Sequence, residues 1–301
     1  MTDQPLVSIV TPSLNQGEFL EHTLLSVANQ TYPHLEHLVL DGGSTDRTLE
    51  LLRQYESRYA LRWWSEPDGG QSHAVNKGFA RARGAIIGWL NADDVYFTRD
   101  ALESVVRTFR AAPDASVVYG DCVFMSRAGT VFRVSPATSA VTREDLQYHG
   151  IDQCAAFFQR RVVHAYSLRQ DLHYLSDYEY WLRLCATERF VHLKKLVAAY
   201  RVYPDSKSFS RSARLEEEWR HVWREYFGTS AGPRGLYRAL RQRAMALGLR
   251  VRGLGRLPEV YRSPLAFPGQ RPPWFWLGVQ QLVLPIGAFA RTRAVSTCAS
   301  R

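Results

Sequence analysis

A group of acidic and amide side chains directly after an apolar segment has the composition of a metal site. Residues 91–94, Asn-Ala-Asp-Asp, follow the apolar run 86–90. Carboxylates at such a strand end hold Mg²⁺ or Mn²⁺ through oxygen ligands, and a diphosphate is the natural counter-ligand. A capped turn is the alternative interpretation, because Asn and Asp are also ordinary turn residues.

A second carboxylate, Asp41, ends another apolar run and precedes two glycines. A carboxylate at this place can accept the N3–H of a pyrimidine base, whereas the glycines also fit a simple Asp-Gly turn. Two further polar groups follow apolar runs in the same way: residues 11–15, Thr-Pro-Ser-Leu-Asn, and residues 66–70, Glu-Pro-Asp-Gly-Gly.

Other common chemistries lack their motifs. The histidines do not have HExxH spacing, the serines lack a GxSxG elbow, and no Gly-Lys-Ser/Thr follows the glycine pair 69–70. The 4 cysteines are too widely spaced for a zinc knuckle and too few for a disulfide scaffold. These absences argue against a zinc hydrolase, a serine hydrolase and a P-loop NTPase, and the cysteine usage fits a reducing compartment.

The segments that carry the polar groups alternate between strand and helix patterns. Strands are predicted at 6–11, 38–41, 61–65, 85–90 and 116–119, and helices from near 17, after 44–46, over 71–82 and over 99–111. Such alternation predicts an α/β fold with a doubly wound, mostly parallel sheet. Because ligands bind beyond the carboxyl ends of parallel strands, we expect the four polar groups to converge on one rim.

The alternation ends near residue 120. A hairpin is predicted from 123–125 and 130–134, followed by a strand at 155–159, a helix at 178–186 and a returning strand at 191–200.

The net charge is +9 and is distributed unevenly along the 301 residues. Residues 1–200 carry a net charge of −3, whereas residues 201–301 carry +12. The first residues, 1–16, lack the basic and long apolar stretches of a secretory signal, so we expect a cytoplasmic protein.

Five ordered segments together resemble family 2 glycosyltransferases, and most closely the bacterial enzymes that build O-antigen and related surface polysaccharides. The segments are 7–15, 41–46, 66–70, 91–94 and 177–184, within a similarity that covers about residues 5–210. The resemblance implies a GT-A fold, a nucleotide-sugar donor, a divalent metal and inversion at the anomeric carbon.

The resemblance also implies functions for individual residues. Donor and nucleotide contacts are expected from Thr11, Pro12, Asn15, Asp41, Asp68, Asn76, Asn91, Ala92 and Asp93. Asp93 would hold the metal, Mg²⁺ or Mn²⁺, with Asn91 as a weaker ligand because the family has Asp there. Tyr203 stands where the family often has His, which leaves the third protein ligand open.

Asp177 matches the position of the family's general base. An inverting transfer needs one base to take the proton of the acceptor hydroxyl, and a carboxylate in the first turn of a helix is stabilised as an anion. The alternative interpretation is a simple helix N-cap. Acceptor contacts are expected from Gln153, His149 and Glu179.

The resemblance divides the chain into three parts. Residues 1–120 would form the nucleotide-sugar-binding half and 121–210 the acceptor half of one GT-A domain, with 211–301 as a helical, basic C-terminal region. Arginines interleaved with apolar residues over 211–262, and an aromatic stretch at 274–290, are typical of interfacial helices. The stretch is too short and interrupted to span a bilayer, and an appendage packed on the catalytic domain fits equally well.

The sequence therefore predicts an inverting transferase that uses a nucleoside-diphosphate sugar, with UDP as the expected nucleotide. Its acceptor would be a saccharide linked to a polyprenyl diphosphate, at an anionic membrane surface on the cytoplasmic face of the inner membrane. No nucleic-acid-binding signature accompanies the arginines. Two alternatives stay open: a sugar nucleotidyltransferase, and a catalytically weakened nucleotide-sugar-binding protein docked on the membrane.

Overall fold

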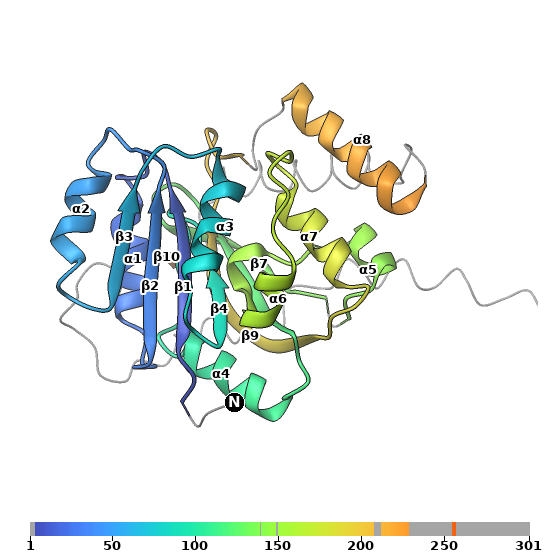
Figure 1. Cartoon of the computed structure of the whole chain (residues 1–301), viewed down its shortest axis with the longest axis horizontal. Coiled ribbons are helices and arrows are strands. Elements are labelled where there is room, and N and C mark those ends of the chain that lie inside the picture. Colours follow the sequence, from blue (N-terminus) through green and yellow to red (C-terminus); the bar gives the residue numbers. More distant parts are fainter. Residues whose placement is uncertain (1–3, 139, 149, 208–211, 229–254, 257–301) are drawn as a thin grey trace, which may run out of the picture. The chain divides into compact units, whose positions relative to one another are not determined.

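The computed structural model describes residues 4–138, 140–148, 150–207, 212–228 and 255–256 (Figure 1). All of them belong to the first of two units, residues 1–266; the second unit, residues 267–301, lies outside the described residues. The strands are β1 (Val7–Ser13), β2 (Leu35–Asp41), β3 (Leu61–Ser65), β4 (Ile86–Trp89), β5 (Val95–Tyr96), β6 (Val117–Met125), β7 (Thr130–Ser135), β8 (Ala156–Gln159), β9 (Phe190–Arg201) and β10 (Gly255–Arg256). The helices are α1 (Leu20–Ala28), α2 (Thr48–Tyr55), α3 (Gln71–Arg81), α4 (Ala101–Ala111), α5 (Arg143–Tyr148), the 3₁₀ turn η1 (Gln153–Ala155), α6 (Arg160–Ala165), α7 (Ser176–Leu184) and α8 (Ala213–Phe227).

The first four long strands form a parallel sheet with β1 between β2 and β4 and with β3 outside β2. A helix connects each strand to the next, as parallel pairing requires. The register matches Ser13 with Asp41 and Asp41 with Ser65, so the carboxyl ends of three strands meet at one edge. The predicted α/β fold with a doubly wound, mostly parallel sheet is confirmed, and the polar groups at its rim lie on neighbouring strands.

The second half extends the same sheet. Strand β8 is antiparallel to β4 and to β6, and β6 forms a hairpin with β7, which also pairs with β10. Strand β9 runs parallel to β6 and then reaches β5, directly after the loop that carries Asp93. Position 120, the predicted boundary between the two halves, falls inside β6, so both halves share one sheet.

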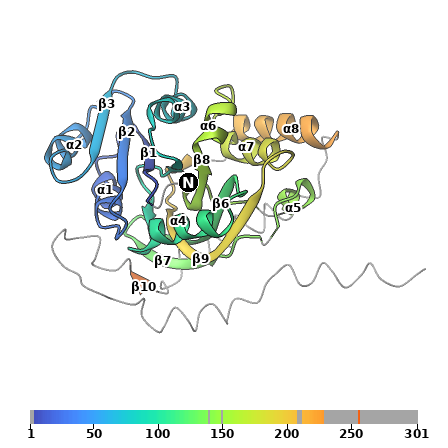
Figure 2. The same ribbon diagram turned by 60° about the horizontal axis from the view of Figure 1, so that its bottom comes forward.

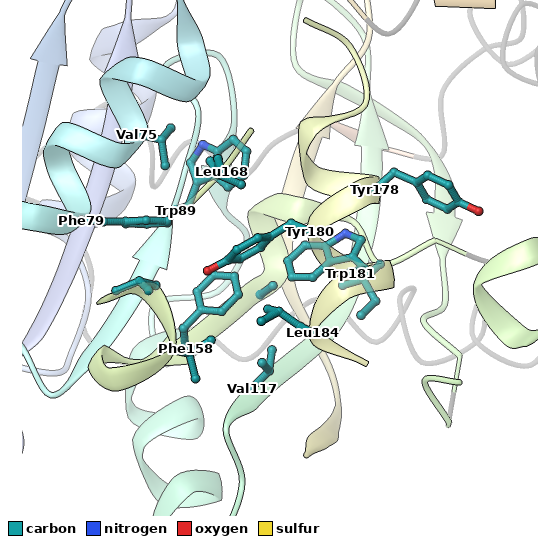
Figure 3. Close-up of a cluster of buried hydrophobic side chains, with 14 of the residues drawn as sticks. Val75, Phe79, Trp89, Val117, Phe158, Leu168, Tyr178, Tyr180, Trp181 and Leu184 are labelled. Carbon is teal, nitrogen blue, oxygen red and sulfur yellow. The ribbon is translucent and has the colours of Figure 1, made fainter. Parts of the chain in front are cut away.

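Apolar side chains alternate between the two faces of the sheet, which gives a core on each side. On one face, Val10 and Trp89 contact α3, and Phe158 stacks on Trp181 of α7 with ring centroids 5.7 Å apart (Figure 3). On the other face, Ile9 packs with α4. Helix α8 lies along the outer side of α7 (Figure 2).

Strand β6 corrects one prediction, because residues 116–119 and 123–125 form a single strand rather than two. Gly120 and Asp121 interrupt the apolar pattern and so resemble a turn in the sequence. A Cβ at Gly120 would lie 2.3 Å from Val197 Cγ2, so glycine allows β9 to approach here, where the β6–β9 register shifts.

The C-terminal region is described only in part. Helix α8 lies in this region, and Gly228 ends it in the left-handed conformation at φ 69°. The remaining predicted basic and aromatic stretches, 229–254 and 257–301, lie outside the described residues. Within the described part of the chain, no helix has the length and apolar character needed to cross a membrane.

Candidate active site

Two neighbouring loops at the rim, after β1 and after β2, are joined by hydrogen bonds. The backbone N–H of Asn15 donates to Ser44 Oγ at 2.7 Å, and the N–H of Thr45 donates to Asn15 Oδ1 at 2.9 Å. The N–H of Gly17 donates to Asp46 Oδ2 at 2.8 Å. Asn15 has a φ of 52°, a conformation that asparagine tolerates better than most residues. The predicted donor residue Asn15 therefore holds the rim together.

Asp41 is 2% exposed and fixed by its own loop. Its Oδ2 accepts from the N–H of Gly43 at 3.1 Å, the N–H of Ser44 at 2.9 Å and Ser65 Oγ at 2.6 Å, and its Oδ1 accepts from Ser44 Oγ. These bonds are those of an Asp-Gly turn. Because a carboxylate has about four acceptor sites, these four bonds use its capacity, and Asp41 would have to give up one of them to accept a further donor.

Thr11 and Pro12 are buried in β1, so their side chains support the rim from inside the sheet. The hydroxyl of Thr11 is hydrogen bonded to His37 Nε2 at 2.9 Å. Asp68 is half-buried at the rim, and its Oδ1 accepts from the N–H of Gly70 at 2.7 Å.

Asn76 has both of its polar groups bonded to one backbone position across the site. Its Nδ2 donates to the carbonyl of Leu168, and its Oδ1 accepts from the N–H of Leu168, both at 2.9 Å. This pair ties α3 to the segment that leads into α7. Asn76 therefore joins the first half of the chain to the second.

Asn91 is the centre of a hydrogen-bond network at the end of β4. Its Oδ1 accepts from Gln71 Nε2 at 2.8 Å and from Trp89 Nε1 at 2.9 Å. Its Nδ2 donates to Gln153 Oε1 at 2.9 Å and to Asp94 Oδ2 at 3.3 Å. Since the two acceptor sites of Oδ1 are in use, Asn91 would have to give up a bond before it could ligate a metal.

Asp93 is half-buried at the tip of this loop. Tyr203 donates its hydroxyl to Asp93 Oδ2 at 3.0 Å, and Arg201 Nε donates to the carbonyl of Asp93 at 2.8 Å. Burial raises the pKa of Asp93, and the Tyr203 hydrogen bond and the charges of Arg201 and Lys207 oppose this rise. Tyr203 therefore occupies one acceptor site of the Asp93 carboxylate.

Asp94 and Arg201 form the buried base of the loop. Asp94 is 0% exposed, and its Oδ1 accepts from the backbone N–H of Arg201 at 2.9 Å. The guanidinium of Arg201 lies 4.8 Å from the centre of the Phe19 ring and donates to the carbonyl of Arg127 at 2.8 Å. Burial and the charge of Asp93 raise the pKa of Asp94 well above its usual value. Strand β9, which ends at Arg201, therefore supports the loop after β4.

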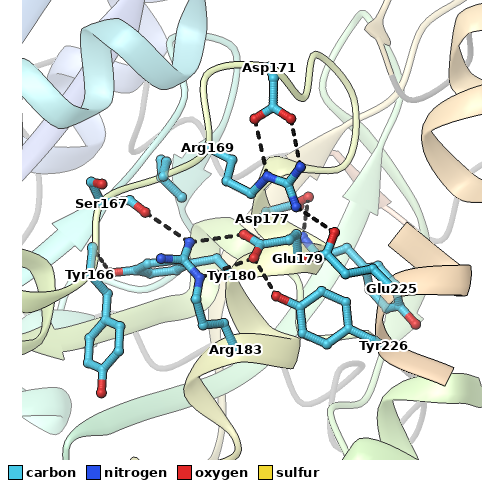
Figure 4. Close-up of polar contacts among 12 residues, drawn as sticks. Tyr166, Ser167, Arg169, Asp171, Asp177, Glu179, Tyr180, Arg183, Glu225 and Tyr226 are labelled. Carbon is cyan, nitrogen blue, oxygen red and sulfur yellow. Dashed lines mark hydrogen bonds and ion pairs between the residues drawn. The ribbon is translucent and has the colours of Figure 1, made fainter. Parts of the chain in front are cut away.

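Two predicted acceptor residues are bonded within the protein. Gln153 Nε2 donates to the carbonyl of Trp89, so Gln153 supports the loop after β4 with both ends of its amide. Glu179 is 1% exposed and accepts from Arg183 Nη2 at 2.9 Å and from the Tyr226 hydroxyl at 2.6 Å (Figure 4). The third predicted residue, His149, lies outside the described residues.

Asp177 is the second residue of α7 and is half-buried (Figure 4). The N-cap interpretation is wrong, because Leu175 occupies the cap position. The loop before the helix is held by Glu218 of α8, whose carboxylate accepts from the N–H groups of His173 and Tyr174 at 2.8 and 2.7 Å. Helix α8 therefore sets the position of Asp177.

Lys207 lies between the start of α3 and the segment before α7. Its ammonium donates to Gln71 Oε1 at 3.0 Å, at the start of α3, and to the carbonyl of His173 at 3.3 Å, before α7. It also interacts electrostatically with Asp93 and with Asp177. The sequence motifs did not point to Lys207, Glu218 or Arg201, because their partners are distant in the sequence.

The residues present fit a divalent cation shared with a substrate. No three His, Cys, Asp or Glu side chains in the described ranges stand together as a protein-only metal centre. Mg²⁺ is commonly held by one or two carboxylates together with substrate phosphates. Asp93 provides one such carboxylate at the rim.

Comparisons with known proteins agree with this arrangement. The sequence profile described as Glycosyl transferase family 2 matches residues 8–166. The chain is 28% identical over 227 residues to TuaG of Bacillus subtilis (strain 168), a glycosyltransferase assigned to teichuronic acid biosynthesis, covering 74% of this chain and 88% of TuaG. It is 29% identical over 209 residues to the hyaluronan synthase of Pasteurella multocida, covering 69% of this chain but only 21% of the synthase.

Solved structures share the fold. Residues 1–349 of S. aureus TarS in complex with UDP-GlcNAc superpose with a TM-score of 0.61 at 17% identity, over 72% of this chain and 65% of that chain. The mannosyltransferase PcManGT from Pyrobaculum calidifontis, in complex with GDP-Man and Mn²⁺, gives a TM-score of 0.58 at 19% identity, over 93% and 81%.

The sheet has the GT-A fold of these structures, and together with the family profile it defines a glycosyltransferase. The chain belongs to glycosyltransferase family 2.

Proposed function

We propose that this enzyme transfers a sugar, with inversion, from a nucleoside-diphosphate donor to a saccharide hydroxyl, and that the nucleotide is UDP. The observation that carries the proposal is that Lys207 bonds both to the start of α3 and to the segment before α7, and that two carboxylates from distant segments interact with its charge. Asp93 lies after β4 and Asp177 in the first turn of α7, and Lys207 interacts with both.

The donor is held at the rim in this proposal. Asp41 accepts the N3–H of the uracil base in exchange for one of its present hydrogen bonds, while the bonds between the loops after β1 and β2 keep Asp41 in place. Asp68 lines the same pocket. Asp93 holds a divalent cation together with the diphosphate, and that cation supplies neutralisation of the charge on the leaving group.

Asp177 is the general base. Its carboxylate takes the proton of the acceptor hydroxyl as that oxygen forms a bond to the anomeric carbon. The bond from this carbon to the diphosphate oxygen breaks on the opposite side, which inverts the configuration. The N-terminal end of α7 stabilises Asp177 as the anion that this step requires.

The acceptor is proposed to be a saccharide linked to a polyprenyl diphosphate in bacterial surface-polysaccharide synthesis. Two observations support this choice: relatives such as TuaG carry names from such pathways, and residues 201–301 carry a charge of +12. A basic region of this kind suits the anionic surface at which a lipid-linked saccharide is presented.

A donor panel tests the proposal. UDP-, GDP- and dTDP-sugars are incubated with the full chain, Mg²⁺ or Mn²⁺ and lipid-linked saccharide acceptors, and nucleotide release is followed with the stereochemistry of the product. We expect release of UDP and an inverted linkage. Release of pyrophosphate would instead indicate a nucleotidyltransferase, and binding of donor without any turnover would indicate a binding protein.

A further inference from the structure

The surroundings of Lys207 differ from those of a lysine that only forms a surface ion pair. Among the described residues, its two hydrogen-bond partners are neutral oxygens, the side-chain Oε1 of Gln71 and the backbone carbonyl of His173. An ammonium has three donors, so these two bonds leave one donor for a ligand. Within the described part of the chain, the contacts hold the ammonium between α3 and the segment before α7 without an ion pair to a carboxylate.

The same site has less negative charge than a pair of carboxylates would give. Position 91 is a neutral Asn, and its amide is bonded to Gln71 and Trp89. At Asp93, the Tyr203 hydroxyl occupies one oxygen. These features leave a single charged side chain at the tip of the loop to hold a cation.

We propose that Lys207 binds the donor diphosphate directly and supplies part of the charge neutralisation that a divalent cation alone would otherwise provide. This inference rests on the proposed function. The inference makes Lys207 a binding residue for the diphosphate leaving group. It also implies that donor binding persists, though weakened, without a metal.

A positive charge near the diphosphate stabilises the negative charge that develops on this group during transfer. When the bond between the anomeric carbon and the diphosphate oxygen breaks, the electron pair stays on that oxygen and the acceptor proton goes to Asp177. Lys207 remains protonated throughout and donates its third hydrogen to a phosphate oxygen. Such charge-assisted hydrogen bonds are roughly twice as strong as neutral ones.

The hydrogen bonds to Gln71 and His173 fix the position of the Lys207 ammonium before the donor binds. Gln71 is itself fixed, because its Nε2 donates to Asn91 Oδ1 at 2.8 Å. A preorganised charge loses little freedom when the diphosphate binds. This arrangement links the diphosphate contact to the loop that carries Asp93.

The test is the affinity for UDP, measured by calorimetry on the full-length protein in excess EDTA and again in Mn²⁺. We expect wild type to bind UDP in EDTA and Lys207→Met to bind it about tenfold or more weakly, the loss of one charge-assisted hydrogen bond. Lys207→Arg should retain most of the affinity, because its guanidinium keeps the charge. GDP and dTDP are measured in the same way.

Lys194→Met is the matched control, because it removes an exposed lysine from β9, seven residues before Arg201 and roughly 20 Å away along the strand. The inference is overturned if Lys207→Met binds UDP in EDTA as tightly as wild type, or if wild type needs Mn²⁺ for any binding. If wild type binds no nucleoside diphosphate even with Mn²⁺, the proposed function itself fails.

Discussion

At the scale of single residues, the carboxylates near the start of α7 illustrate what a sequence can and cannot predict. The sequence predicts Asp177 as the base from its motif, and it predicts Glu179, two residues further on, as an acceptor contact that faces away from Asp177. A helix turns by about 100° per residue, so the two side chains face different directions. Glu179 is directed to Arg183 and Tyr226, and the second of these partners lies in a helix that no motif had connected to it.

Replacing Asp177 by Asn tests its assignment as the base. The amide cannot accept a proton, so we expect transfer to fall by about 10²–10⁴-fold while UDP binding is retained. Asp171→Asn is the control, because it removes an exposed carboxylate that pairs with Arg169 in the segment before α7. Transfer by Asp177→Asn at the wild-type rate would remove Asp177 from this function.

The hydrogen bonds of Asn91 predict that an Asp at this position destabilises the loop after β4. An Asp would lose the Nδ2 donor and place an acceptor against Asp94 Oδ2 and Gln153 Oε1. We expect Asn91→Asp to lower the free energy of unfolding by about 1–3 kcal/mol, measured by urea denaturation. Adding Asp94→Asn exchanges donor and acceptor and should restore part of the loss; no loss in the single variant would contradict the network.

At the scale of elements, the strands and helices of the first half were predictable because their apolar spacing is regular and each ends in polar residues. From β6 onward, the predicted element boundaries agree less well with the structure, because β6 is one strand where two were predicted. Gly120 breaks the pattern of β6 because of β9, a strand 70 residues later, and such long-range packing leaves no local signal. For the same reason, Gln153 and Asn76 matched the family's positions, but their hydrogen-bond partners could not be predicted.

The pairing of β1 and β2 includes a buried histidine with a consequence for stability. His37 is 0% exposed and bonded to Thr11 and Tyr59, and burial lowers its pKa from the ordinary 6.5 to about 3. Below pH 6.5 the unfolded chain therefore takes up a proton that the folded protein does not. Stability is lost as the pH falls, by roughly 2 kcal/mol between pH 6.5 and 5.

Thermal unfolding between pH 7.5 and 5 measures this effect. We expect His37→Gln, which has no titrating ring, to show a shallower loss of stability toward acid than wild type. His164→Gln removes an exposed histidine and controls for the loss of an imidazole. Equal slopes for wild type and His37→Gln would show that His37 does not contribute.

At the scale of the whole molecule, the net charge of the N-terminal two thirds differs in sign from that of the C-terminal region. Residues 1–200 carry −3 and residues 201–301 carry +12, with Trp274 and Trp276 of the residue type that settles at lipid headgroups. We expect the full chain to float with vesicles that contain anionic lipid at low salt, and salt to weaken this binding through screening.

A truncation after Gly228 is the comparison, because α8 ends there and positions Asp177. Among the described elements it removes only β10. We expect the truncated protein to stay with the soluble fraction and to retain slow hydrolysis of UDP-sugars. If both proteins float equally at low salt, the C-terminal region is an appendage of the catalytic domain and not a membrane anchor.

The bonds that complete the loop after β4 also determine when it can form during synthesis. Strands β1 to β4 can pair as soon as they leave the ribosome, but Asp94 receives its partner from the backbone of Arg201, 107 residues later, and Asp93 receives Tyr203 after 110. At about 5–20 residues per second, these partners emerge at least several seconds after the carboxylates. We therefore expect a nascent chain to acquire its donor site only once the whole catalytic unit has been translated.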